Sequence, residues 1–370
     1  MSGQPEERTH VLHVSYGFGW GGMELVLSRL ITELSDRGMR HTVLSLRGGD
    51  AMARYIPDDM EVVCLRARAN DPRLPGRIAQ QIRRIRPTVI HARNWGAWPD
   101  TAVGRLLTWP IVPLIFSFHG YGDETGASLR RRATARVLAK MTTHLFALSE
   151  RSKQMLVSEW GWPESGVDVI PNGVDTERFR PSERPRSAGR LVVGSAGRLE
   201  TIKNYTLLVR ACADLVRSGV DLELHIAGTG SEQQPLLDLA GSLGLADRFR
   251  LPGYVDDMTR FLQSLDVFAL SSDSEQHPNA LNEAMACGLP CVATRVGGVE
   301  ELLDGGRCGR IVPPGDTEGL TGALRDLLTD PESQRRHALA ARQRVCKRYS
   351  LERMVEAYAA MYRQFSRKAT

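Results

Sequence analysis

The chain has 370 residues, 42% of them hydrophobic and 25% charged, with a formal net charge of +5. A chain of this length is usually too long to fold around a single hydrophobic core, so we expect two domains of ordinary globular composition. No apolar run approaches the roughly 18 residues that a membrane span needs, and the polar start of the chain lacks the pattern of a signal peptide. These features argue against an integral membrane protein and predict a cytoplasmic one.

The first half of the chain alternates short apolar strands with helices. Such alternation is typical of a parallel sheet covered by helices on both faces. We predict strands at 11–15, 41–46, 61–65, 88–92, 113–118, 144–148 and 167–170, and helices from residue 23 and at 75–86, 99–107, 129–141 and 149–160.

A break follows at Pro171-Asn172-Gly173-Val174-Asp175 and the polar, proline-rich segment 181–187, which predicts a domain boundary. We therefore expect a first domain over 1–172, a second over 173–350 and a last helix over 351–370 that returns to the first domain. The second domain repeats the alternation, with strands at 191–195, 222–227, 248–251, 267–270 and 291–294, and helices ending near 217 and at 235–243, 317–328, 331–348 and 351–367. Ligands bind beyond the carboxyl ends of such strands, so a cleft between the two domains is the predicted site.

Two glutamates, Glu275 and Glu283, flank the start of a helix that we predict from Pro278 to Gly288. A helix start offers free N–H groups and a positive dipole end, which suit phosphate; Asn279 and Ala280 lie there. Carboxylates accept hydrogen bonds from sugar hydroxyls. A ligand with phosphate groups between two sugars matches this arrangement, and a nucleotide sugar is such a ligand. For Glu283 alone, a solvent-facing position on an amphipathic helix is the alternative.

Arg198 and Lys203 follow a predicted strand, just before the next helix. A guanidinium and an ammonium together offset the charges of a diphosphate and stabilise it as a leaving group. Two surface cations without a ligand are the alternative.

Two positions in the first half also follow strands. Gly22, after Gly21, permits close approach of a ligand to the backbone, and His119 ends an apolar strand at the edge where a catalytic group would lie. A structural histidine is the alternative. A glycine-rich loop is weak evidence when taken alone. The absence of a phosphate-binding Gly-Lys-Ser/Thr loop disfavours P-loop enzymes. Without an Asp-x-Asp motif, we expect chemistry that needs no metal.

The excess positive charge lies in the first half, where residues 1–172 hold 22 Lys and Arg against 17 Asp and Glu, while 173–370 hold 26 of each. The cluster formed by Arg130, Arg131, Arg132, Arg136 and Lys140 predicts either contact with an anionic membrane or a solvated helix face. Nucleic acid is disfavoured, because no aromatic residues interleave with the arginines. The six scattered cysteines lack a zinc pattern and predict small core residues.

In combination these segments resemble the retaining glycosyltransferases of family 4 (group 1). The resemblance covers nearly the whole chain and rests on Gly21-Gly22-Met23-Glu24, Ile170 to Asp175, Gly197-Arg198-Leu199 with Lys203-Asn204, Gly228-Thr229-Gly230, and Glu275 with Glu283. It implies the GT-B fold, an α/β architecture of two facing Rossmann-like domains with parallel sheets. The segment 91–97 is similar to a subgroup of sugar transferases associated with bacterial exopolysaccharide systems.

The resemblance implies a role for each matching position. Arg198 and Lys203 would bind the donor diphosphate, Glu283 the ribose, and Glu275 the hydroxyls of the donor sugar. His119 would line the sugar pocket, and Gly22 would approach the donor or acceptor. The backbone near Tyr254 and Val255 would hold the base, and Gly228, Asn279 and Ala280 complete the expected donor site. One departure stands out, because Gln276-His277 replaces the usual small-apolar pair after the first glutamate.

The predicted activity is transfer of a hexose, with retention, from a nucleoside-diphosphate sugar to a hydroxyl of a glycan or lipid-linked glycan, in bacterial polysaccharide biosynthesis. The nucleotide sugar is a substrate, and no cofactor is expected. Two alternatives remain: a nucleotide-sugar epimerase of the same fold, and a non-catalytic sugar-nucleotide-binding subunit. The presence together of Arg198, Lys203, Glu275 and Glu283 disfavours the second.

Overall fold

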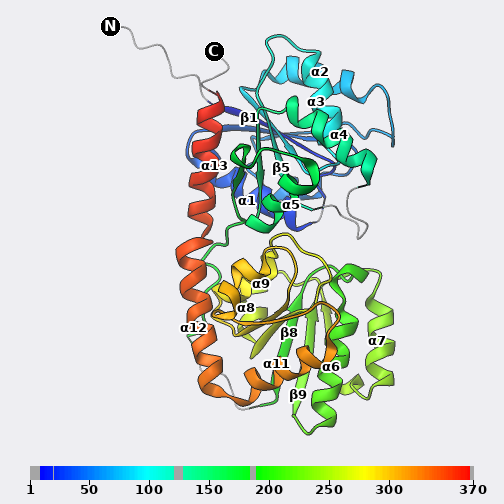
Figure 1. Cartoon of the computed structure of the whole chain (residues 1–370), viewed down its shortest axis with the longest axis vertical. Coiled ribbons are helices and arrows are strands. Elements are labelled where there is room, and N and C mark those ends of the chain that lie inside the picture. Colours follow the sequence, from blue (N-terminus) through cyan, green and yellow to red (C-terminus); the bar gives the residue numbers. More distant parts are fainter. Residues whose placement is uncertain (1–8, 20, 121–127, 184–188, 367–370) are drawn as a thin grey trace. The chain divides into compact units, whose positions relative to one another are not determined.

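The computed structural model describes residues 9–19, 21–120, 128–183 and 189–366, in two compact units (Figure 1). Unit 1 comprises Met1–Pro171 and Arg353–Thr370, and unit 2 comprises Asn172–Glu352. Part of the predicted proline-rich segment, residues 184–187, lies outside the described residues, as does Arg367 at the predicted end of the last helix.

Unit 1 is built on a seven-stranded parallel sheet in the order β3-β2-β1-β4-β5-β6-β7. The direction of strand addition reverses beside β1, as in doubly wound sheets. The strands are β1 (His10–Ser15), β2 (Arg40–Ser45), β3 (Glu61–Cys64), β4 (Val89–Arg93), β5 (Leu114–Phe118), β6 (His144–Ala147) and β7 (Val167–Val169). The predicted parallel sheet is confirmed.

Two helices of unit 1 begin at serine caps. Ser128 accepts a hydrogen bond from the Arg131 N–H, and Ser149 accepts one from the Ser152 N–H, so each begins a helix. The helices are α1 (Gly22–Asp36), α2 (Leu74–Ile85), α3 (Trp98–Leu106), α4 (Leu129–Lys140), α5 (Glu150–Trp160) and α13 (Leu351–Ser366), with 3-10 turns η1 (Ala51–Tyr55) and η2 (Glu164–Gly166).

Side chains alternate between the two faces of this sheet. One face packs on α2 to α5 through an apolar core in which the Trp98 and Phe116 rings stack 4.0 Å apart. The opposite face meets α13, where the Phe365 ring lies 4.8 Å from that of His144. On that second face β4 presents His91 and Arg93, both almost fully buried. Unit 1 therefore has one apolar layer and one layer that contains buried polar groups.

Unit 2 has a six-stranded parallel sheet in the order β10-β9-β8-β11-β12-β13. Its strands are β8 (Leu191–Ala196), β9 (Leu222–Ala227), β10 (Phe249–Gly253), β11 (Val267–Leu270), β12 (Cys291–Thr294) and β13 (Arg310–Val312). Its helices are α6 (Tyr205–Arg217), α7 (Gln233–Ser242), α8 (Met258–Gln263), α9 (Asn279–Ala286), α10 (Val299–Leu302), α11 (Thr317–Thr329) and α12 (Pro331–Arg348), with 3-10 turns η3 (Thr201–Lys203), η4 (Ala246–Arg248) and η5 (Asp304–Gly306).

Among the strands and α-helices that the structure describes in unit 2, the sequence missed three, β13, α8 and α10. Each spans six residues or fewer, and so short a segment carries too little periodicity to distinguish a helix or strand from a loop. Elsewhere the ends differ from prediction by a residue or two, as helix assignments usually do. In the part of the chain that the structure describes, no helix is both long and apolar enough to cross a membrane.

Candidate functional site

The loop from Gly197 to Asn204 leaves the carboxyl end of β8 and carries both predicted phosphate-binding cations. Gly228, with φ +146°, lies against this loop so closely that a Cβ there would be 1.8 Å from the Gly197 carbonyl oxygen. Only glycine fits such a contact. At the other end, Asn204 adopts a left-handed φ of 44° and accepts a hydrogen bond from the Leu207 N–H, which begins α6. The loop is therefore fixed at both ends.

Lys203 and Glu275 form an ion pair at the end of this loop. Lys203 Nζ lies 2.6 Å from Glu275 Oε1, with side-chain exposures of 20% and 12%. The Ser272 hydroxyl donates to the same oxygen at 2.8 Å. Charge-assisted bonds of this kind are strong where solvent is limited. The structure thus brings together two residues for which the sequence predicted separate contacts with the donor.

Backbone contacts join the two loops that carry this pair. The Ser271 hydroxyl donates to the Lys203 carbonyl at 2.9 Å, and the Asp273 N–H donates to the Ile202 carbonyl at 2.9 Å. The Asn204 amide donates to Asp273 Oδ1, also at 2.9 Å. Because β8 and β11 are adjacent and parallel, both loops leave the same edge of the sheet. The ion pair is therefore a consequence of strand order.

Gly297 and Gly298, which follow β12, hold the Glu275 loop from its other side. Gly297 has φ +48°, and a Cβ there would lie 1.7 Å from the Glu275 carbonyl oxygen. The Gly298 N–H donates to the Gln276 carbonyl at 2.9 Å. Sequence reasoning missed these two glycines. A glycine pair between a strand and a helix was the available signal, of the same kind as Gly21-Gly22.

Arg198 has a different partner. Its Nη1 lies 2.5 Å from Glu200 Oε1, and its side chain is 61% exposed. Exposed ion pairs contribute little free energy, typically about 0–1 kcal/mol. The guanidinium therefore gives up little on leaving Glu200 for an anionic ligand.

The helix α9 begins at Asn279, one residue after Pro278, close to the predicted start, and its last residue is Ala286. Glu283 is only 8% exposed, so the solvent-facing alternative for this residue is wrong. Asn279 Oδ1 accepts a hydrogen bond at 2.9 Å from the amide of Asn172, and Ala280 in the same turn is partly buried. The first turn of α9 is thus held by the segment that opens unit 2.

The two residues of the unusual pair Gln276-His277 differ in solvent exposure. Gln276 is partly exposed, whereas His277 is 7% exposed and its ring lies 5.4 Å from that of Tyr349. Burial lowers the pKa of His277 to about 4, so the imidazole is neutral near pH 7. His277 is therefore a neutral packing residue in the interior of unit 2.

Tyr254 and Val255 lie in the loop after β10, at the same carboxyl edge of the unit 2 sheet. Tyr254 is 57% exposed, and Val255 packs on the apolar cluster beneath α9. The Gly228 N–H donates to the Gly253 carbonyl at 2.8 Å. The end of β10 is therefore tied to the glycine that supports the Arg198 loop.

The two site residues predicted in unit 1 are Gly22, the first residue of α1, and His119, which follows β5. His119 Nε2 lies 2.8 Å from the Ser117 hydroxyl. Burial, with a smaller contribution from the Arg93 charge, lowers the pKa of His119 to about 3. A neutral imidazole with so low a pKa is a poor proton acceptor at neutral pH. Hydrogen bonding is its available chemistry.

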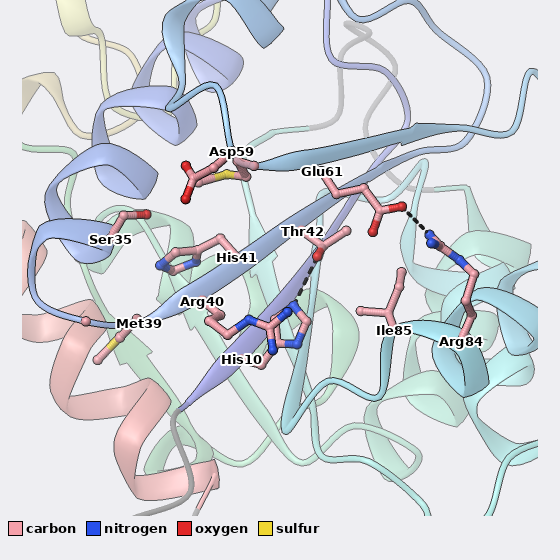
Figure 2. A pocket seen from close by; sticks show the side chains of 12 residues that line it. His10, Ser35, Met39, Arg40, His41, Thr42, Asp59, Glu61, Arg84 and Ile85 are labelled. Carbon is pink, nitrogen blue, oxygen red and sulfur yellow. Dashed lines mark hydrogen bonds and ion pairs between the residues drawn. The ribbon is translucent and has the colours of Figure 1, made fainter.

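A separate hollow of about 400 Å³ lies at the other edge of the unit 1 sheet, where β1, β2 and β3 begin (Figure 2). Inside it, Glu61 pairs with Arg84 at 2.6 Å, and His10 Nε2 lies 3.0 Å from the Thr42 hydroxyl. None of the predicted site residues lines it. It is distinct from the candidate site.

Two family models together match most of the chain. The model of the group 1 glycosyl transferases matches residues 176–344, and that of Glycosyltransferase Family 4 matches residues 20–178. The chain is 30% identical to a glycogen synthase of Mycobacterium tuberculosis over 75% of this chain and 69% of that protein. It is 29% identical to the lipopolysaccharide core biosynthesis glycosyltransferase LpsE of Rhizobium meliloti over 94% and 97%.

Solved structures share the fold. A glycosyltransferase of Rickettsia africae superposes with a TM-score of 0.83 at 18% identity, covering 97% of this chain and 99% of that one. HepE of Anabaena, solved in complex with UDP, gives 0.82 at 22% identity, covering 96% and 100%. Together with the two parallel sheets, these similarities show that the chain is a GT-B glycosyltransferase that belongs to family 4, group 1.

Proposed function

We propose that this enzyme transfers a hexose from a nucleoside-diphosphate sugar to a hydroxyl of a glycan or lipid-linked glycan, with retention, in bacterial polysaccharide biosynthesis. The observation that carries the proposal is the Lys203–Glu275 pair at the carboxyl edge of the unit 2 sheet. It offers a cation for phosphate and a carboxylate for sugar hydroxyls within one hydrogen bond of each other.

Each donor contact follows from the chemistry of its side chain. Lys203 stabilises the charge that develops on the leaving diphosphate, and Arg198 leaves Glu200 to bind two phosphate oxygens through parallel hydrogen bonds. The N–H groups of Asn279 and Ala280, at the start of α9, face the same anion. Glu283 accepts hydrogen bonds from the ribose hydroxyls, and Glu275 from those of the hexose. The backbone at Tyr254 and Val255 holds the base.

Unit 1 supplies the remaining contacts in this proposal. Gly22 allows the donor or acceptor to approach the backbone, and His119 hydrogen-bonds the transferred sugar. The acceptor oxygen forms its bond to the anomeric carbon on the face from which the diphosphate departs, and the departing phosphate oxygen takes the acceptor proton. Catalysis then rests on positioning and on leaving-group stabilisation by Lys203 and Arg198, without a metal ion.

The relatives support the substrate class. HepE of Anabaena has been solved with UDP-glucose, and LpsE of Rhizobium meliloti acts in lipopolysaccharide core biosynthesis. We therefore propose a UDP-hexose as the first donor to test and a bacterial surface glycan as the acceptor.

We further propose that the enzyme contacts anionic membrane through α4 and the adjacent end of α3. Arg130, Arg136 and Lys140 are exposed on α4, and so is Val137. The Arg105 guanidinium donates to the Met141 carbonyl at 2.6 Å, which joins the ends of the two helices. Trp109, a little beyond α3, is 89% exposed. Basic and aromatic side chains together suit the membrane interface.

A thermal-shift panel of UDP-, GDP- and ADP-sugars tests the donor, because a ligand that binds the folded state raises Tm. Nucleoside-diphosphate release is then measured with and without bacterial glycan extracts. Isomerised sugar nucleotide without acceptor would establish the epimerase alternative instead. Binding without release, under any acceptor, would indicate a non-catalytic subunit.

A further inference from the structure

Three hydrogen bonds connect α13 to His119 through the buried polar face of the unit 1 sheet. Tyr362 Oη lies 2.7 Å from His91 Nδ1, and His91 Nε2 lies 2.8 Å from Ser117 Oγ. Ser117 Oγ in turn lies 2.8 Å from His119 Nε2. Tyr362, His91 and Ser117 are all 0% exposed. The four groups form one continuous chain of hydrogen bonds, and its first three members are shielded from water.

Both imidazoles in this chain are neutral. Burial, followed by the Arg93 charge, lowers the pKa of His91 well below its usual value, and the same two causes lower that of His119 to about 3. A neutral imidazole has one N–H donor and one acceptor nitrogen, and each hydroxyl donates one proton. Two arrangements satisfy all three bonds with the Ser117 O–H inside the chain: donation runs from Tyr362 toward His119, or from His119 toward Tyr362. A third arrangement, in which Ser117 accepts from both imidazoles, leaves the buried Ser117 O–H outside the chain and is disfavoured, because a buried donor without a partner is costly.

Arg93 distinguishes the two arrangements. It follows His91 by two residues on the same face of β4, is 1% exposed, and its guanidinium carbon lies 5.6 Å from the centre of the Tyr358 ring. Its charge also acts on the Tyr362 hydroxyl and on His91. The guanidinium is a cation and cannot accept a hydrogen bond. The more stable orientation of the Tyr362 hydroxyl therefore has the oxygen lone pairs toward Arg93 and the O–H directed away from it.

With that orientation Tyr362 donates to His91 Nδ1, His91 Nε2–H donates to Ser117, and Ser117 donates to His119 Nε2. In the reverse arrangement the Tyr362 oxygen would accept a hydrogen bond from His91, and its buried phenolic proton would point toward the guanidinium. A buried donor without a partner is unfavourable, and repulsion from the cation adds to this.

We propose that this chain holds His119 in the tautomer protonated at Nδ1, so that it presents an N–H donor. Tyr362, His91 and Ser117 are then positioning residues, and Arg93 sets the direction of the chain. Resting on the proposed function, the Nδ1–H of His119 donates to a hydroxyl oxygen of the transferred sugar. The proposal gives a role to His91 and Arg93, which β4 buries together on the polar face of the sheet.

The test is a two-bond ¹H–¹⁵N correlation spectrum of the full chain labelled at histidine, recorded without substrate. His119 is assigned by the signal lost in His119→Gln. We expect a protonated Nδ1 and an unprotonated Nε2 for His119 in the wild type. Ser117→Ala removes the hydroxyl that joins the two imidazoles and is expected to convert His119 to the Nε2–H form.

Two further variants complete the design. Arg93→Met removes the charge and is expected to leave His119 as a mixture of tautomers. Tyr358→Phe is the matched control, because Tyr358 lies on the same buried helix face and its hydroxyl makes no hydrogen bond of normal geometry; its spectrum should match the wild type. An Nε2–H form in the wild type, or an unchanged tautomer in Ser117→Ala, would overturn the inference. Absent transferase activity with an Nδ1–H tautomer would refute the proposed function alone.

Discussion

Lys203 and Glu275 are 72 residues apart in the sequence, yet their side chains meet at 2.6 Å. The pair is largely screened from water, and Ser272 donates to the same carboxylate oxygen. Glu275 thereby orients the ammonium before any donor binds. A preorganised cation needs little rearrangement when charge develops on a leaving group.

Lys203→Ala is therefore expected to lower kcat by on the order of 100-fold, comparable to the loss of one charge-stabilising donor in other active sites. Steady-state assays with saturating donor measure the change. Lys347→Ala, an exposed lysine on α12, is the matched control and should retain wild-type turnover. A wild-type kcat in Lys203→Ala would rule out its role at the diphosphate.

Glu283→Ala is expected to weaken binding of the free nucleoside diphosphate more than it slows the chemical step. The reason is that Glu283 is proposed to contact the ribose, which does not change in the reaction. Isothermal titration with the nucleoside diphosphate gives the affinity, and Glu332→Ala on the exposed start of α12 serves as control. An unaltered Kd in Glu283→Ala would remove the ribose assignment.

Gly297→Ala should both lower Tm and weaken donor binding. The added Cβ would lie 1.7 Å from the Glu275 carbonyl oxygen at a φ of +48°, so the Glu275 loop has to move. The cost is expected to be about 1–3 kcal/mol. Gly241→Ala in α7 meets nothing within 4 Å and should stabilise by up to about 1 kcal/mol. Equal Tm values for the two variants would contradict this view of Gly297.

Acidification should destabilise unit 2 through His277. Its folded-state pKa, lowered by burial to about 4, lies below the unfolded value of about 6.5. The unfolded chain therefore binds the extra proton first, and stability falls as pH drops from about 6.5 to about 4. His277→Phe keeps a ring against Tyr349 and should show a shallower decline in urea-unfolding free energy. Parallel declines for the two proteins would mean that other groups cause the effect.

Membrane contact is expected to depend on charge and on Trp109. Co-sedimentation with anionic vesicles should fall as salt is added, since screening weakens surface electrostatics. The double variant Arg130→Glu with Arg136→Glu, and separately Trp109→Ala, should each reduce binding. Arg335→Glu with Lys347→Glu, on exposed positions of α12, changes charge equally and should bind normally. Binding that ignores salt, or none at all, would leave α4 a solvated helix.

Much of the architecture was predictable because its causes are local. Strands such as β9 (Leu222–Ala227) and helices such as α12 (Pro331–Arg348) were predicted at their observed ends, since buried strands, proline at a helix start and polar caps leave clear patterns. The short elements β13 and α8 lack that length.

From the sequence alone we could predict the two parallel sheets, the family, and the charged residues that follow the strands, such as Arg198 and Lys203. The tertiary structure alone decided which of them meet. Lys203 meets Glu275 because β8 and β11 are adjacent, and strand order decides which loops lie side by side. Arg198 instead pairs with Glu200 in its own loop. The tertiary structure likewise buried His277, and it aligned Tyr362, His91, Ser117 and His119. Such chains depend on which face of a sheet a distant helix covers, a relation that no local pattern encodes.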